Sequence, residues 1–176
     1  MADSNINATG NYCGAFVGDS KGNIENCHTQ ADVIVSGTEY VGGITGSVDG
    51  SASLEQCSNA AKVIASAKYV GGITGEVYST STTAVSKSYN IGSVQGANWV
   101  GGIAGTLYSG GTIINVYNVG SVTANKVAGS LVGRVRAGSI QNTYTAGTLE
   151  GETKGAIIGD LEYANGAKSL TNVFYQ

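Results

Sequence analysis

The stretch Tyr40–Gly46 reads YVGGITG, is repeated letter for letter at Tyr69–Gly75, and returns as WVGGIAG at Trp99–Gly105. The last glycine of this phrase recurs along the whole chain, about 28 residues apart each time. The six anchor glycines are Gly18, Gly46, Gly75, Gly105, Gly133 and Gly159. Repetition at a fixed period of this size indicates a solenoid, in which each copy stacks on the next.

Large apolar residues stand two positions before every anchor glycine. They are Phe16, Ile44, Ile73, Ile103, Leu131 and Ile157. A second large apolar residue follows two positions after most anchors, so the pattern has a period of two, which is typical of a strand with one buried face. We expect each anchor glycine to point into the core, where its small size lets the opposite wall approach the backbone.

A second phrase follows the first in every copy and keeps a fixed length of ten residues. Its copies are IENCHTQADV (24–33), LEQCSNAAKV (54–63), VSKSYNIGSV (85–94), IINVYNVGSV (113–122) and IQNTYTAGTL (140–149), with a sixth begun by LTNVFYQ (170–176). The segment between the two phrases varies in length, as surface loops do. Gly92, Gly120 and Gly147 form a glycine column in this phrase, and we expect them at a corner that needs a positive φ.

These patterns predict one all-β domain over residues 1–176, a parallel β-solenoid (β-helix) of about six coils with two or three short strands in each. Coils are expected to begin near residues 12, 40, 69, 99, 127 and 153, after an N-terminal cap or added segment at 1–11. Paired glycines in every copy argue against helical repeats, and propeller blades need longer units. At one strand spacing per coil, the rod would be about 29 Å long.

The composition excludes several classes of function. The chain has 28 glycines, no proline, 12% charged residues and a net charge of −3, with its nine basic residues spread thinly. A nucleic-acid partner needs a basic patch, so none is expected. No apolar run reaches the length of a membrane span, so membrane insertion is not expected either. A surface rich in small polar residues favours an extracellular or bacterial cell-surface location.

Residues 100–122, VGGIAGTLYSGGTIINVYNVGSV, resemble the GLUG motif. GLUG repeats occur in tandem in large bacterial surface and secreted proteins, including regions of some IgA-specific metallopeptidases. The resemblance implies a structural repeat without catalytic residues or a cofactor of its own. The metallopeptidase domain of those relatives has no counterpart here, because no H-E-x-x-H occurs in the sequence.

Cysteine and histidine offer little chemistry in this pattern. His28 follows Cys27 on an expected strand, so the two side chains would point to opposite faces. Cys27 and Cys57 occupy the same column on adjacent coils, where the strand spacing of about 4.8 Å permits either a disulfide or packed free thiols. An odd cysteine count without C-x-x-C argues against a metal site.

Glu25 and Glu55 are stacked acids, and they keep open the alternative of a carbohydrate-binding or carbohydrate-cleaving β-helix. The other interpretation is a solvated surface pair. Two aromatic columns also recur, namely Tyr12, Tyr40, Tyr69 and Trp99, and Tyr89, Tyr117, Tyr144 and Phe174. We expect both to stabilise the stack. Tyr78 and Tyr108, at equivalent positions in the variable loops, are the candidate ligand-binding residues.

The sequence therefore predicts a non-catalytic stalk or spacer of a bacterial surface or secreted protein, with an adhesive role for its loops as a further hypothesis. The partners expected on this basis are a host glycan or matrix protein and the neighbouring domains of a longer chain. An uncovered last coil also predicts end-to-end self-association, because free strand edges recruit partners.

Overall fold

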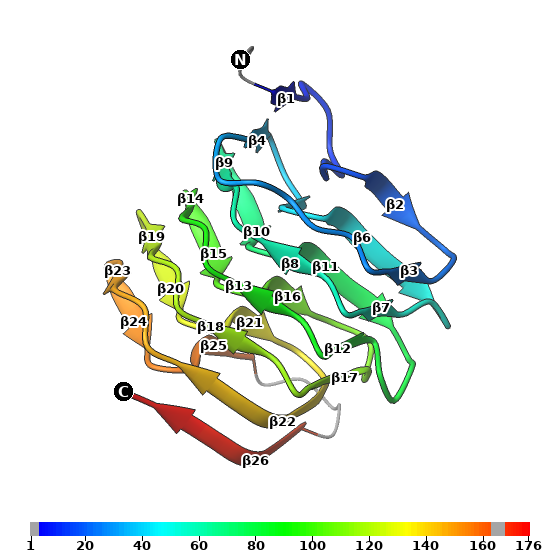
Figure 1. The fold of residues 1–176 in the computed structure, drawn as a ribbon. Helices are drawn as coiled ribbons and strands as arrows, with labels where there is room; N and C mark the ends of the chain where they lie inside the picture. The colour runs from blue at the N-terminus through cyan, green and yellow to red at the C-terminus, as the bar shows by residue number, and fades with distance from the viewer. Residues whose placement is uncertain (1–3, 163–167) are drawn as a thin grey trace.

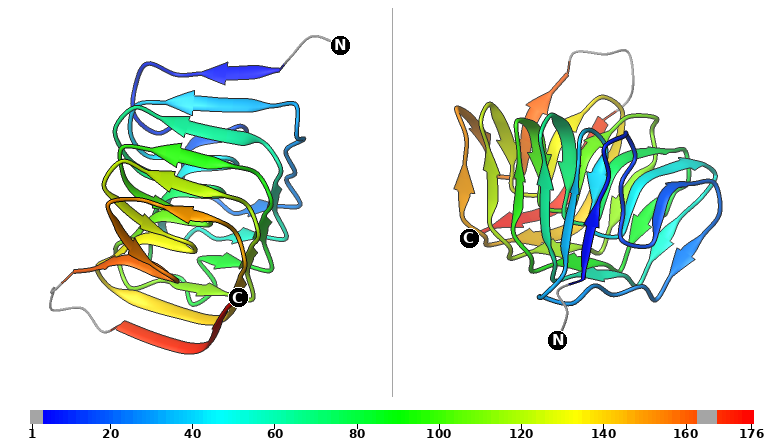
Figure 2. Two further views of the ribbon diagram at one scale, coloured as in Figure 1. Left: turned by 90° about the vertical axis from the view of Figure 1, so that its left-hand side faces the viewer. Right: turned by 90° about the horizontal axis from the view of Figure 1, so that it is seen from above.

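The chain winds into a parallel β-solenoid of about six coils, and its two ends lie at opposite ends of the stack (Figures 1 and 2). The computed structural model describes residues 4–162 and 168–176, and these residues contain no helix. Among them, accordingly, no helix could span a membrane. The predicted fold class is confirmed.

Four parallel sheets run along the solenoid, named here A to D. Sheet A contains β1 (Asn5–Asn7), β4 (Ile34–Gly37), β9 (Lys62–Ala65), β14 (Val94–Gly96), β19 (Val122–Ala124) and β23 (Leu149–Glu150). Sheet B contains β5 (Val41–Gly42), β10 (Lys68–Gly71), β15 (Asn98–Gly101), β20 (Val127–Gly129) and β24 (Thr153–Gly155). Sheet C contains β2 (Val17–Ser20), β6 (Thr45–Gly50), β11 (Thr74–Ser79), β16 (Ala104–Leu107), β21 (Val132–Val135) and β25 (Ile158–Leu161).

Sheet D is built from the second phrase, which the second, third and fourth coils divide into two short strands. Its first row is β3 (Ile24–Glu25), β7 (Leu54–Glu55), β12 (Val85–Ser86), β17 (Thr112–Ile114), β22 (Gly138–Thr145) and β26 (Lys168–Tyr175). Its second row is β8 (Ser58–Asn59), β13 (Tyr89–Asn90) and β18 (Tyr117–Asn118). Strand β18 pairs in turn with the second half of β22. The prediction of two or three strands per coil was therefore too low, because the second phrase turns between its two strands.

The register between coils is the one that the repeat alignment predicts. Val41, Val70 and Val100 pair directly in sheet B. In sheet D, Tyr89 pairs with Tyr117. An ion pair also follows the register, since Lys68 Nζ lies 3.8 Å from Glu39 Oε1 on the adjacent coil.

The left-handed backbone region recurs at two positions of the repeat without glycine, one in the first four coils and one in all six. At the start of sheet B, Tyr12, Tyr40, Tyr69 and Trp99 have φ values between 48° and 62°. Inside the second phrase, Asn26, Gln56, Lys87, Asn115, Asn142 and Asn172 have φ values between 47° and 55°. This conformation is uncommon for bulky residues, so packing around the aromatic side chains must hold them there.

The buried side chains form two clusters. One lies between sheets C and D and includes Ile44, Ile73 and Ile103, each with no exposed surface. The other joins sheets A and B and is mostly valine. The first coil differs, because Phe16, its equivalent of these isoleucines, is half exposed. The predicted core positions of the three isoleucines are confirmed.

The glycine columns allow neighbouring coils to approach each other closely. This corrects two predictions, namely that the anchor glycines make room for the opposite wall and that the glycines of the second phrase need a positive φ. A Cβ added to Gly75 would strike the backbone of Tyr40, and one added to Gly105 would strike that of Tyr69. The obstacle is therefore the corner of the preceding coil and not the opposite wall. Gly92 has no positive φ, and a Cβ there would strike the carbonyl oxygen of Ala61.

A ladder of buried asparagines links the two repeated phrases. Asn59, Asn90 and Asn118 are fully buried, and each donates from Nδ2 to the next oxygen along the row. The two amide-to-amide bonds are 2.8 Å long. The second glycine of each V-G-G faces this ladder, so that an added Cβ would strike an asparagine side chain at Gly43, Gly72 and Gly102. The two phrases recur together because each requires the other in the core.

Candidate functional site

The outer face of sheet C carries two columns of side chains, because alternate residues of each strand point outward. Column 1 is Asp19, Ser47, Glu76, Thr106, Arg134 and Asp160, paired in register from coil to coil. Column 2 lies two residues further along the chain in each coil, within the strand or just after it, and is Lys21, Asp49, Tyr78, Tyr108, Arg136 and Glu162. Charged and aromatic residues are thus concentrated on a face that the core does not need.

The corner at the start of sheet B adds a continuous stack of aromatic rings beside column 1. Tyr12, Tyr40, Tyr69 and Trp99 stack with ring centroids 4.7, 4.9 and 5.1 Å apart and interplanar angles of 20° or less. We call this row the corner stack. The left-handed backbone at each of these residues directs the rings alongside sheet C.

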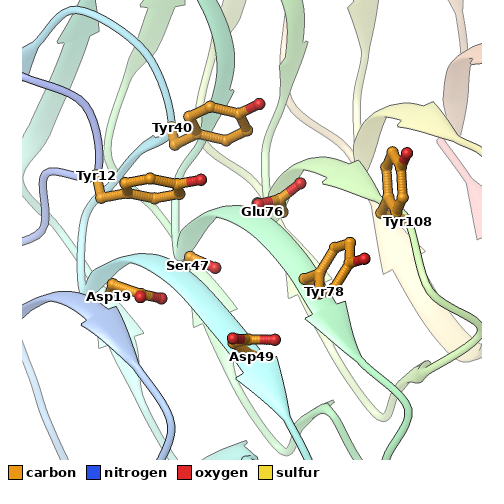
Figure 3. Close-up of a pocket in the computed structure, with 8 residues that line it drawn as sticks. All are labelled: Tyr12, Asp19, Tyr40, Ser47, Asp49, Glu76, Tyr78 and Tyr108. Atoms are coloured by element: carbon orange, nitrogen blue, oxygen red, sulfur yellow. The ribbon is translucent and has the colours of Figure 1, made fainter.

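Between the corner stack and column 2 lies a groove of about 340 Å³, the sheet C groove. Its lining residues are Tyr12, Asp19, Tyr40, Ser47, Asp49, Glu76, Tyr78 and Tyr108. Figure 3 shows Tyr12 and Tyr40 on one side, Tyr78 and Tyr108 on the other, and Glu76 between them. The volume is at the lower end of the range for small-ligand sites.

Glu76 is the most unusual group in the sheet C groove. The residue is only 8% exposed, and among the described residues its carboxylate has neither a hydrogen-bond partner nor an ion-pair partner. Burial raises its pKa to about 7, and the charges of Asp49 and Asp19 add to the shift. Burial, with a contribution from Glu76, also raises the pKa of Tyr12 and Tyr40. The groove is therefore acidic and partly desolvated.

At the C-terminal end of the same face, the chain supplies its own cations. The Arg134 guanidinium lies 4.5 Å from the centroid of the Trp99 ring and donates to Tyr69 Oη over 3.3 Å. It also pairs with Glu162 at 2.8 Å. Arg136 lies over the Tyr108 ring, donates to its hydroxyl group, and pairs with Glu162 at 3.4 Å.

The structure places the two predicted ligand-binding tyrosines in the sheet C groove but not as expected. Tyr78 belongs to strand β11 and is 45% exposed, whereas Tyr108 is half-buried beneath Arg136. The predicted loop position was wrong for Tyr78, which lies in a strand, whereas Tyr108 lies in the segment after β16, as predicted. Glu76 was not among the residues singled out from the sequence. Aligning the outward-facing positions of neighbouring strands would have placed it in one column with Asp19 and Ser47.

The acid pair singled out from the sequence lies on sheet D. Glu25 and Glu55 pair in register, as predicted, and Glu55 Oε1 forms an ion pair of 2.7 Å with Lys87 Nζ. Lys87 comes from the left-handed turn of the next coil, which the column alignment did not consider. The sheet C groove, and not this pair, is where acids gather.

The cysteines are free thiols in the structure. The Cys27 backbone N–H lies 3.5 Å from Cys57 Sγ, so the two residues are adjacent as predicted without being bonded. Burial raises the pKa of the Cys57 thiol to about 11. His28 Nδ1 is 2.8 Å from Ser58 Oγ. Among residues 4–162 and 168–176, no three His, Cys, Asp or Glu side chains are grouped to hold a metal ion.

Sheet D carries a second, more open aromatic surface. The rings of Tyr89 and Tyr117 stack 4.8 Å apart and nearly parallel, and Tyr144 and Phe174 continue the column with exposed rings. Beside them, the amides of Asn115, Asn142 and Asn172 are hydrogen-bonded in a row. A shallow hollow of about 630 Å³ lies between the two rows.

Comparison with known proteins gives one informative likeness. The crystal structure of a Bacteroides ovatus protein, provisionally named an immunoglobulin A1 protease, superposes with a TM-score of 0.77 at 25% sequence identity. The match covers 97% of this chain and 56% of the other, so this chain spans just over half the length of that protein. No protein-family model matches the chain, and neither does any curated protein. The β-solenoid is thus shared with a bacterial protein.

Proposed function

We propose that this chain is a non-catalytic β-solenoid segment of a bacterial surface or secreted protein, which holds neighbouring domains apart. The observation that carries the proposal is the unbroken register of four sheets through all the described coils. Such a stack is stiff along its axis and can be lengthened by adding coils. The likeness to a segment of a Bacteroides ovatus protein supports the bacterial setting.

The spacer function predicts that coils can be added without loss of folding. A second copy of residues 40–126, inserted after residue 126, should extend the rod by three coils, or about 14 Å. Small-angle scattering of both proteins measures this difference, and circular dichroism checks that strand content rises in proportion. An unfolded product, or a folded one of unchanged length, would contradict the proposal.

Location and catalysis need tests of their own. Protease treatment of intact source cells should release fragments of an exposed segment, whereas protection of the protein would argue against a surface location. A panel of polysaccharides should show no turnover. Turnover that is lost in Glu55→Gln would replace this proposal with the carbohydrate-cleaving alternative.

Carbohydrate binding without cleavage is the second candidate function, and the sheet D surface favours it. Exposed rings of Tyr117 and Tyr144 beside a row of asparagine amides offer stacking faces and hydrogen-bonding groups together. A glycan and matrix-protein array should compare wild type with two double variants. Loss of binding in Tyr117→Ala/Tyr144→Ala would place the site on sheet D, and loss in Tyr78→Ala/Tyr108→Ala would place it in the sheet C groove.

End-to-end self-association remains a further proposal. Strand β26 pairs with β22, and its Leu170 and Phe174 side chains are 54% and 63% exposed. A second copy stacked on this edge would cover them. Light scattering over a range of protein concentrations should show a mass that rises toward the dimer, and a constant monomer mass would remove the proposal.

A further inference from the structure

The two halves of the outer face of sheet C contain the same kinds of aromatic and acidic side chains, but only the C-terminal half contains arginine. In the C-terminal half, aromatic rings and carboxylates surround two guanidinium groups of the chain itself, those of Arg134 and Arg136. In the N-terminal half, rings and carboxylates occur in the same columns with no arginine between them. The sequence contains two arginines in all, and both are used in the C-terminal half.

We propose that the sheet C groove binds a guanidinium group supplied from outside the chain, as on an arginine side chain. The internal example shows the geometry that such a group takes. The Arg134 guanidinium lies 4.5 Å from the centroid of an aromatic ring, donates to a phenol oxygen, and pairs with two carboxylates. The groove repeats these elements with the tyrosines of the corner stack, the column 2 tyrosines and three carboxylates.

Glu76 is the strongest indication of an absent partner. The Glu76 residue is more than nine-tenths buried. A carboxylate on so buried a residue is normally paired or hydrogen-bonded, because an uncompensated charge largely removed from water is costly. Glu76 lies between the two tyrosine pairs and has no such partner among the described residues. A planar guanidinium, with five N–H donors, can reach a carboxylate and a neighbouring oxygen at once.

Neither cation at the edge of the groove fills it. Arg136 lies over the Tyr108 ring and pairs with Glu162. Lys21 Nζ lies 3.8 Å from Asp49 Oδ2, and its side chain is 76% exposed at the rim. Ion pairs as exposed as this contribute little to the free energy of folding and are screened by salt. A ligand cation could therefore enter without displacing a strong internal contact, and Asp19, Asp49 and Glu76 would share its charge.

The guanidinium inference goes beyond the spacer function and does not depend on it. The test is an NMR titration of the full 176-residue chain at pH 8 with the peptide acetyl-Gly-Arg-Gly-amide. A matched peptide carries citrulline, which has the same shape without the charge, and a third carries lysine. Agmatine, a free guanidinium compound, distinguishes a small-molecule source from a polypeptide source by its relative affinity.

We expect saturable binding of the arginine peptide in the millimolar range, with shifts centred on β6 and β11. The citrulline peptide should not bind, and the lysine peptide should bind several-fold more weakly. Glu76→Gln should weaken arginine binding at least about tenfold, the size expected for a charge-assisted hydrogen bond. The control variant Glu25→Gln removes a carboxylate on sheet D and should bind normally.

Binding should also strengthen several-fold from pH 6 to pH 8 in wild type, because Glu76 loses its proton in this range. The charged groups that face Glu76 are Asp19 on β2 and Asp49 on β6 with its partner Lys21. Burial raises the pKa of Tyr12 and Tyr40 above its ordinary value, so these two groove tyrosines stay neutral in this range. In Glu76→Gln the pH dependence should be absent. Equal binding of the citrulline or lysine peptide, unchanged binding by folded Glu76→Gln, or no binding to wild type at 20 mM peptide would each overturn the inference.

Discussion

Ser130 Oγ is hydrogen-bonded to Thr145 Oγ1 in the fifth coil, at the positions that hold a glycine and an asparagine in the three coils before it. In those coils the asparagine side chain fills the space that a glycine Cβ would need. In the fifth coil a larger residue replaces the glycine and a smaller one replaces the asparagine. The two positions therefore act as one packing unit.

This exchange can be tested in the fourth coil. Gly102→Ser should destabilise the protein by about 2 kcal/mol, because the new side chain overpacks against Asn118. Asn118→Thr should also destabilise, because it breaks the amide ladder. The double variant copies the fifth coil and should recover at least about 1 kcal/mol relative to the sum of the single changes. Urea unfolding measures all four proteins, and strictly additive effects would show that the positions are independent.

The corner stack predicts a contrast between two replacements of one residue. Tyr69 has a φ of 62°, a region that asparagine tolerates and β-branched residues avoid. Tyr69→Asn and Tyr69→Ile both remove the ring from the stack, so their difference isolates the backbone. The isoleucine variant should be less stable by about 1 to 2 kcal/mol. Thermal unfolding of the pair gives the answer, and equal stability would mean that the corner relaxes freely.

Core and loop positions should respond very differently to added atoms. Gly75→Val should destabilise by about 3 kcal/mol, because a side chain there meets the backbone at Tyr40. Three residues inserted after Gly110, whose surroundings are open, should destabilise by less than about 1 kcal/mol. Denaturant midpoints distinguish the two, and small effects from both would contradict the packing described for the anchor glycines.

Stability should depend on pH through Glu76. Its pKa is raised to about 7 in the folded chain from an ordinary value near 4.5, so the folded state holds a proton that the unfolded state releases. The resulting stabilisation is fully present below about pH 4.5 and is lost as the pH rises through 7. Melting temperatures of wild type minus those of Glu76→Gln, measured from pH 4 to 8, should fall across this window. A constant difference would show that Glu76 is not desolvated.

The Cys57 thiol should react slowly. A rise in pKa from 9.0 to about 11 lowers its thiolate fraction at pH 8 about 100-fold, and the thiolate is the reactive form. Iodoacetamide labelling, followed by peptide mass spectrometry, should therefore modify Cys57 at least tenfold more slowly in folded protein than in urea. Rapid labelling of the folded chain would contradict the burial of this side chain.

The repeat determined most of the architecture in advance. Aligning the repeated phrases predicted that Ile44 and its equivalents form a core column and that each phrase stacks on the next, because a solenoid places equivalent residues directly above one another. The four-sheet cross-section did not follow from the sequence. Where the chain turns depends on left-handed corners at residues such as Tyr40 and Gln56, whose side chains do not signal that conformation.

The candidate site shows the same division. The sequence alone determined which residues share a column, and so placed Tyr78 with Tyr108 and Glu25 with Glu55. Only the tertiary structure decided that Glu76 is buried beside the corner stack, because its burial depends on the angle at which sheet B meets sheet C. Repetition fixes neighbours along the axis of the solenoid, whereas contacts around the cross-section depend on the angles at its corners, and these angles determine the shape and charge of the groove.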